Sequence, residues 1–309
     1  MKRFFLLALV ATLCLPVLAE VDGGGMAGAY LQVNWSARVA AMGGAFVGVA
    51  DDAEGGLHNP AGVIQLSKKH VTASYRQMQL DRKMSFVSYA QSLKDNDAGI
   101  GLSWINVGVS DEQRDTNGEI PGDINYSENL IALTFGKRFF RQLLVGVNLK
   151  YDHANLAELS ANGLGFDFGL LWGEKRPYKI GFTVQNVGLT HDWTTGDFYK
   201  NQGYTGSSTK DKFPIAVKAG GSYRFYQNKV LLALDLEKRE KQQMLVHAGG
   251  EGWINQYLAV RAGYNRDFVT LGAGVRYSWS KTTVSFNYAF NAGQVDLDPE
   301  NLISVAVEF

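Results

Sequence analysis

The sequence predicts an all-β fold, a 14-stranded antiparallel transmembrane β-barrel preceded by an N-terminal hatch or plug segment. From about residue 69 onward, segments of roughly ten residues alternate apolar and polar side chains, which is the period of a β-strand. These segments match the ~9–11 residues that a tilted strand needs to cross a bilayer. The chain also holds 35 glycines and only 6 prolines, and no later stretch is apolar enough for a membrane-spanning helix.

Residues 1–19 have the three parts of a secretory signal peptide. Lys2 and Arg3 form the positive region, an apolar run follows, and Ala19 precedes the expected cleavage site. Cys14 lies inside the apolar run, so the mature chain is expected to hold no cysteine, which excludes disulfides and cysteine metal sites. Cleavage removes 2 of the 30 basic residues and leaves 28 against 30 acidic ones, a balance that does not predict a nucleic-acid partner.

The barrel is expected to span residues 69–309. Its last strand is expected to end in the periplasm, which places the tight turns on that side. The two longest connections, 108–126 and 189–212, then fall outside the cell, as is typical of these barrels. Aromatic residues at the tight-turn ends predict an interfacial girdle of Phe139, Phe140, Trp172, Phe225, Trp253 and Trp279. The fourteen expected strands are 69–78, 82–92, 97–107, 127–138, 142–153, 162–173, 178–188, 213–225, 229–238, 243–251, 255–264, 267–278, 281–290 and 300–309.

The predicted inner face of the barrel carries charges of both signs. A balanced lining pairs within itself, because unpaired charge in a narrow lumen is costly. We therefore expect a largely filled lumen, which argues against a general porin. The expected inner charges are Lys150, Lys218, Arg224, Arg261 and Arg276 with Asp152, Asp167, Asp235, Glu237 and Glu251.

Residues 20–68 do not alternate in polarity and contain several short blocks of small and polar residues. The blocks are Ser36-Ala37-Arg38, Met42-Gly43-Gly44-Ala45, Val49-Ala50-Asp51-Asp52-Ala53 and His58-Asn59-Pro60-Ala61-Gly62. Two interpretations follow from the residues alone. The segment is either a flexible leader rich in turns or a compact plug whose glycines allow close backbone packing.

The order of these blocks between Ala37 and Gly62 resembles the N-terminal signature of the FadL superfamily, and the Ala-Met-Gly-Gly-Ala-Phe-Val spacing is most similar to the PorV/PorQ family. Outside this run only the architecture matches. FadL-type barrels carry long-chain fatty acids or other hydrophobic compounds across the outer membrane. PorV-type barrels serve type IX secretion and bind secreted cargo. The resemblance implies a hatch built from Gly43, Gly44, Asp51, Asp52, Asn59, Pro60, Ala61 and Gly62.

On this resemblance we expect a non-enzymatic component of type IX protein secretion or surface attachment, located in the outer membrane of a Gram-negative bacterium. The alternative is a FadL-type transporter, which needs an apolar pocket beneath the outer loops, whereas the predicted lumen is mostly polar or small. Expected partners are outer-membrane lipid and the barrel assembly machinery, which would read the terminal aromatic Phe309. Further partners are secreted proteins with a C-terminal sorting domain or hydrophobic small molecules.

No catalytic, cofactor or metal site is predicted. No two of the five histidines have metal-ligand spacing, and His247 with Glu251 on one strand is interpreted as part of a charge network. The acidic connection 108–126 could hold calcium but is interpreted as a solvated loop. The connection 189–212 is either a recognition surface or a lid, and its aromatic candidates are Trp193, Phe198, Tyr199 and Tyr204.

Overall fold

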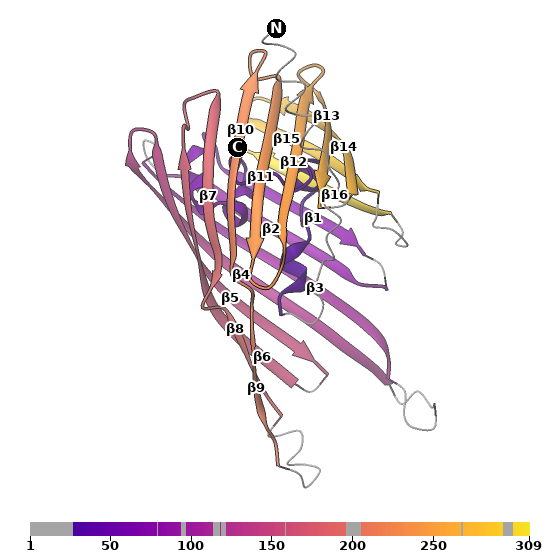
Figure 1. Cartoon of the computed structure of the whole chain (residues 1–309). Helices are drawn as coiled ribbons and strands as arrows, with labels where there is room; N and C mark the ends of the chain where they lie inside the picture. The colour runs from indigo at the N-terminus through magenta and orange to yellow at the C-terminus, as the bar shows by residue number, and fades with distance from the viewer. Residues whose placement is uncertain are drawn as a thin grey trace.

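The computed structural model describes residues 27–309 except 79, 94–96, 114–117, 119–121, 158, 196–204, 267 and 293–298. The expected signal peptide, residues 1–19, lies outside the described part. Fourteen strands form one closed antiparallel barrel, which confirms the predicted fold class. Neighbours in the chain are neighbours in the barrel, except that β7 pairs with β10 and β16 closes the wall on β1 (Figure 1).

Each predicted segment corresponds to one barrel strand. The barrel strands are β1 (His70–Gln77), β2 (Lys83–Ser92), β3 (Ala98–Gln113), β4 (Gly122–Phe140), β5 (Leu143–Leu156), β6 (Leu159–Trp172), β7 (Tyr178–Val187), β10 (Ala216–Phe225), β11 (Val230–Arg239), β12 (Met244–Trp253), β13 (Leu258–Asn265), β14 (Phe268–Trp279), β15 (Thr282–Asn291) and β16 (Glu300–Glu308).

The two connections expected to be long loops both contain paired strands. β3 and β4 pair as far as Gln113 with Gly122, so most of 108–126 continues the barrel wall. The 189–212 connection forms a second sheet of two strands, β8 (Thr190–Thr194) and β9 (Ser208–Lys212), called the outer hairpin below. Extended segments that face each other satisfy their backbone hydrogen bonds by pairing, which needs no apolar alternation.

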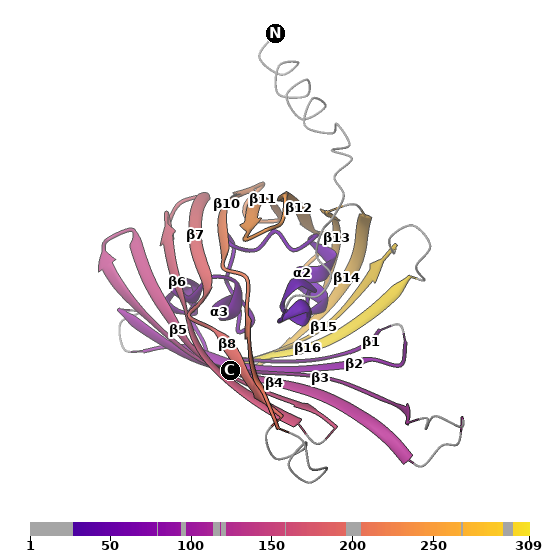
Figure 2. The ribbon, with the colours of Figure 1, turned by 60° about the horizontal axis from the view of Figure 1, so that its bottom comes forward.

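The wall has unequal height. Strands β3 and β4 have 16 and 19 residues, whereas β12 and β13 have 10 and 8. The long strands and the outer hairpin extend toward the same end of the barrel (Figures 1 and 2). This end is called the long-hairpin end, and the opposite one the tight-turn end.

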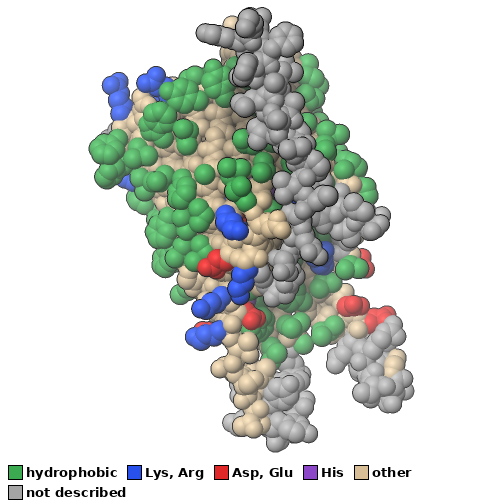
Figure 3. All heavy atoms as spheres, viewed as in Figure 1, with side chains coloured by type: hydrophobic (Ala, Val, Ile, Leu, Met, Phe, Trp, Pro, Cys, Tyr) green, Lys and Arg blue, Asp and Glu red, His purple; other side chains and the backbone are tan. Residues whose placement is uncertain are grey.

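The outer face of the wall is apolar. In β6 the burial of side chains alternates along the whole strand, with Leu164 and Phe168 turned outward and 61% and 50% exposed, and with Asp167 fully buried inside. Hydrophobic side chains cover much of the outer face (Figure 3). At the tight-turn end Phe139, Phe140 and Trp279 are exposed as expected of a girdle. Trp253 differs, because the Arg276 guanidinium stacks 4.0 Å from the centre of its ring.

Residues 27–66, called the inner segment, lie inside the barrel (Figure 2). They contain two short α-helices, α2 (Ala37–Ala41) and α3 (Gly55–His58), and two 3₁₀-helices, η1 (Ala29–Gln32) and η2 (Pro60–Gln65). Most of their side chains are buried against the strands, so the inner segment is a packed body within the lumen. No helix among the described residues is long and apolar enough to span a membrane.

Candidate functional site

The glycine pair of the inner segment allows its backbone to lie directly against the wall. Gly43 and Gly44 have φ angles of +64° and +84°, in the left-handed region that favours glycine. A Cβ atom on Gly43 would lie 2.4 Å from the Tyr264 carbonyl oxygen of β13. The wall contributes glycines of its own, since a Cβ on Gly263 would lie 2.2 Å from the Gly43 nitrogen. These glycines explain how a polypeptide fits inside so narrow a barrel.

The Asn-Pro-Ala-Gly block docks the other end of the inner segment. Asn59 caps η2 by accepting a 3.2 Å hydrogen bond from the Ala61 amide, and its side-chain nitrogen donates to the carbonyls of Val47 and Leu170 at 2.9 Å each. Pro60 is the first residue of η2 and lies against β5, where a Cβ on Gly146 would be 2.2 Å from its carbonyl carbon. A Cβ on Gly62 would lie 2.3 Å from the Ala50 carbonyl oxygen, so this block also holds the inner segment together.

Arg38 of α2 is the centre of a buried charge cluster. Its Nη1 contacts Asp51 and Asp52 at 2.7 Å each, and its Nε and Nη2 donate to Glu251 of β12 at 2.9 and 3.1 Å. Asp51 also pairs with Arg224 of β10. Burial alone would raise the pKa of Asp51, but the nearby cations Arg38, Arg224 and Lys179 together outweigh it and hold this pKa well below its usual range. The two motif aspartates therefore join the inner segment to opposite charges of its own helix and of the wall.

Two further buried contacts hold the inner segment, one with the backbone of the segment and one between its aromatic rings. Asp235 of β11 accepts hydrogen bonds from the Phe46 and Val47 amides at 2.7 and 2.8 Å. His58 stacks on Trp35 with ring centres 4.9 Å apart and packs edge-on against Phe46. Burial lowers the pKa of His58 to about 3, so its imidazole is neutral at ordinary pH.

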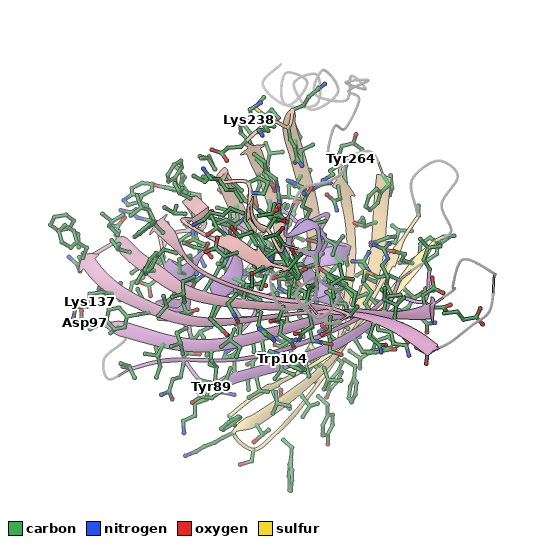
Figure 4. All side chains as sticks on the ribbon, turned by 90° about the horizontal axis from the view of Figure 1, so that it is seen from below. Tyr89, Asp97, Trp104, Lys137, Lys238 and Tyr264 are labelled. Carbon is green, nitrogen blue, oxygen red and sulfur yellow. The ribbon has the colours of Figure 1, made fainter. Side chains whose placement is uncertain are left out.

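Most of the predicted inner charges pair as expected. Lys150 contacts Asp167 at 2.8 Å, and Lys218 contacts Glu237 at 3.1 Å. His247 and Glu251 both belong to charge networks, but to different ones, because His247 contacts Glu237 while Glu251 binds arginines. Side chains crowd the space inside the wall, whereas pairs such as Lys137 with Asp97 lie at its edge (Figure 4).

The expectation of a mostly polar or small lumen is wrong for the side that is lined by strands β2 to β4. There strands β2 to β4 turn apolar side chains inward onto Trp35 and Leu57 of the inner segment. Both faces of β2 are apolar, as the neighbours Phe86 and Val87 show, so the sequence did not reveal which face is inside. The inward apolar side chains of the wall are Met84, Phe86, Ile105, Val107 and Leu130, with Met78 just after β1.

Above this apolar floor a cavity of about 330 Å³ opens at the long-hairpin end. It lies between the start of the inner segment, the ends of β3 and β4, and the outer hairpin. Trp193 is the one candidate of the 189–212 connection that lies in the described part, and it lines the cavity; Phe198, Tyr199 and Tyr204 lie outside the described residues. The lining includes the apolar or aromatic Tyr30, Val33, Met78, Val107, Val109 and Trp193 and the polar or charged Arg82, Tyr126, Glu128, His191 and Asp211.

Sequence reasoning missed the polar corner of this cavity. Glu128, Asp152 and His191 each turn one ligand-type atom into a space where these atoms all lie within 4.8 Å of one another. They come from β4, β5 and β8, so no local spacing in the sequence could have indicated that they lie together. The acidic residues Asp111, Glu112 and Asp123 of the connection 108–126, which was interpreted as a solvated loop, lie exposed on β3 and β4.

No family model matches this sequence, and no curated protein matches it. Among solved structures, the fold resembles the toluene transporter TbuX of Ralstonia pickettii with a TM-score of 0.63 and 13% identity, covering 90% of this chain and 98% of that one. It resembles a FadL homologue of Pseudomonas aeruginosa with a TM-score of 0.59 and 11% identity over 90% and 99%.

The toluene transporter TodX of Pseudomonas putida is similar at a TM-score of 0.57 and 13% identity, over 89% of this chain and 97% of that one. This chain has the fold of the FadL-type outer-membrane barrels. The structural similarity establishes the FadL-type fold. At identities this low, the finer PorV/PorQ resemblance of the sequence motif is a matter of proposal.

Proposed function

We propose that this chain is an outer-membrane barrel that binds hydrophobic compounds at its long-hairpin end and passes them across the membrane. The observation that carries the proposal is the cavity of about 330 Å³ above an apolar floor. Outer-membrane barrels have short periplasmic turns and longer outer loops, so we expect the cavity at the long-hairpin end to face the outside of the cell.

The size and lining of the cavity suit a small apolar ligand. Ligand pockets are typically ~300–1,000 Å³ and mostly apolar with a few polar groups. An apolar cavity of roughly 150 Å³ already accommodates benzene. The present cavity has room for a substituted ring or for part of an acyl chain, and Trp193 and Tyr30 offer aromatic faces to either.

A pair of valine substitutions tests the proposal. Val109 of β3 lines the cavity, whereas Val87 of the adjacent β2 faces outward and is 42% exposed. Val109→Trp is expected to fill the cavity, and Val87→Trp adds the same bulk on the lipid face. Binding of toluene and palmitic acid to the detergent-purified protein, and uptake of the labelled compounds by diderm cells that express it, are measured for both variants.

We expect the wild type and V87W to bind and take up at least one of the two compounds. V109W should lose about tenfold or more of that affinity, because the ligand must first displace the tryptophan side chain that fills the cavity. Equal binding and uptake by V109W and V87W would contradict the cavity as the binding site.

The second candidate is a non-enzymatic role in type IX secretion or surface attachment. Two observations favour it, namely the spacing of the Ala-Met-Gly-Gly-Ala-Phe-Val block and the tight seating of the inner segment by Arg38 and Asn59. A fixed inner segment suits a docking scaffold better than a conduit. If the purified barrel captures secreted proteins that share a C-terminal β-domain, that result supports the secretion role. If the cavity variant V109W captures them equally well, the secretion role does not depend on the cavity and is distinguished from transport.

A further inference from the structure

Three ligand-type side chains meet beside the cavity, and two of them, Glu128 and His191, line it. Glu128 of β4, Asp152 of β5 and His191 of the outer hairpin are 4%, 0% and 3% exposed. The His191 Nε2 atom lies 2.9 Å from the Asp152 Oδ1 atom, and one oxygen of Glu128 completes a group whose atoms lie within 4.8 Å of one another. Ligands around a single ion that binds at ~2.0–2.2 Å lie ~3–4 Å apart, so a small movement of Glu128 closes such a shell.

Among the described residues, the one potential cation paired with the carboxylates of Glu128 and Asp152 is His191. No lysine or arginine of the described part forms an ion pair with Glu128 or Asp152. Lys150, two residues before Asp152 in β5, pairs with Asp167 at 2.8 Å instead. Two buried carboxylates this close repel each other unless a proton or a cation lies between them. A divalent cation supplies the missing charge, as bound cations do at other buried carboxylate sites.

The group is also reachable by an ion. Glu128 and His191 line the cavity of about 330 Å³, together with Tyr30 and Tyr126. These two tyrosines donate hydrogen bonds to Asp152 and Glu128, so each carboxylate is oriented by a hydroxyl. Oriented ligands beside an open space are what a metal centre requires, because the ion needs an entry path and room for water in its remaining positions.

We propose that Glu128, Asp152 and His191 bind a divalent transition-metal ion, with Zn²⁺ as the best match. An imidazole nitrogen with two carboxylate oxygens fits Zn²⁺, whereas Ca²⁺ and Mg²⁺ prefer oxygen ligands alone. The metal takes the place of the proton between His191 and Asp152. It also ties the outer hairpin to β4 and β5, and through Tyr30 to the inner segment.

The test uses Zn²⁺ alone as the ligand, on the mature full-length chain purified in detergent with a histidine-free tag. Equilibrium dialysis followed by elemental analysis is expected to give one saturable equivalent for the wild type. Asp152→Asn and His191→Gln are expected to weaken binding about tenfold or more, the scale that perturbing a metal shell has in other proteins. His153→Gln is the matched control, since His153 follows Asp152 in β5 but bonds Asn162 instead.

Absence of saturable Zn²⁺ binding by the wild type, or retention of full affinity by D152N and H191Q, would overturn the proposal. Heat-modifiable gel mobility shows whether each variant is folded. If a variant does not fold, X-ray absorption at the zinc edge of the wild type decides instead. A shell of nitrogen and oxygen at ~2.0–2.2 Å with imidazole scattering supports the site, and a shell without imidazole refutes it. Because no hydrophobic ligand takes part, either outcome is independent of the proposed transport.

Discussion

Gly249 of β12 shows how single residues seat the inner segment. A Cβ atom there would lie 2.2 Å from the Met42 carbonyl oxygen, which is backbone and cannot turn away. Gly249→Ala is therefore expected to displace α2 and lower the free energy of unfolding by about 1–3 kcal/mol, the usual cost of overpacking. Gly252→Ala is the control on the same strand, because its nearest neighbour would be 3.9 Å away.

Urea unfolding in detergent and protease digestion of the inner segment provide the measurements for both alanine variants. G249A should unfold at lower urea and expose the inner segment to cleavage, while G252A should behave as wild type. Equal stability of the two variants would mean that the inner segment does not rest on β12 as described.

The buried His58 makes stability depend on pH. Its pKa falls from 6.5 to about 3 on folding, so the unfolded chain binds the extra proton between these values. Stability is therefore fully present above pH 6.5 and is lost as the pH falls toward 3, by about 1.4 kcal/mol per pH unit. His58→Phe keeps the aromatic contacts with Trp35 and Phe46 and should flatten this part of the profile.

The measurement is the midpoint of urea unfolding of the wild type and H58F between pH 7 and pH 4. The charged groups around His58, namely Lys150, Lys218, Glu237 and His247, are the same in both proteins, so the difference between the two profiles belongs to His58. Parallel profiles would show that this imidazole is not buried in the folded state.

At the residue level, the sequence predicted which positions matter in the inner segment but not what they touch. Asp51 and Asp52 were recognised from their block, yet their partner Arg38 became evident only from the fold, and Glu251 lies about two hundred residues away. Such pairs depend on which strand faces the inner segment, and local spacing carries no information on that.

Among the elements, the fourteen barrel strands were predictable because burial on one face and lipid on the other impose a period of two. The outer hairpin was not, because β9 consists of Ser208–Lys212, all polar and exposed. Its position depends instead on the residues beside it, with Leu189 buried and His191 bonded to Asp152. A strand without a buried face has no alternation of apolar and polar residues in its sequence, so it cannot be predicted from that period.

The strand β16 closes the barrel on β1, and Phe309 completes that closure. Lys69 and Phe309 exchange two backbone hydrogen bonds of 3.0 Å, and the ring is 48% exposed at the tight-turn end. Deletion of Phe309 removes both bonds and the terminal aromatic. We therefore expect less folded protein in the outer membrane, with ligand binding by the folded fraction unchanged.

Heat-modifiable mobility of membrane fractions measures that folded share, and Phe309→Tyr is the control that keeps an aromatic ring at the end of β16. Wild-type amounts of folded protein after the deletion would show that closure and assembly do not need this residue.

For the molecule as a whole, the main feature is that two sides of the lumen differ in polarity. One side of the lumen is filled by the inner segment and its charge network, whereas the side lined by β2 to β4 is apolar and ends in the cavity. The charges of the first side were visible in the sequence and suggested a secretion scaffold. The apolar side was not visible, because its strands have two apolar faces, and it is this side that favours a hydrophobic ligand.

The most direct test of this account is to identify what the barrel carries when purified from its membrane in mild detergent. Mass spectrometry of small molecules and proteins is applied to the wild type, V109W and V87W. We predict a hydrophobic small molecule with the wild type and V87W that is absent from V109W. A stoichiometric secreted protein with an extra C-terminal β-domain, and no small molecule in any of the three, would contradict it.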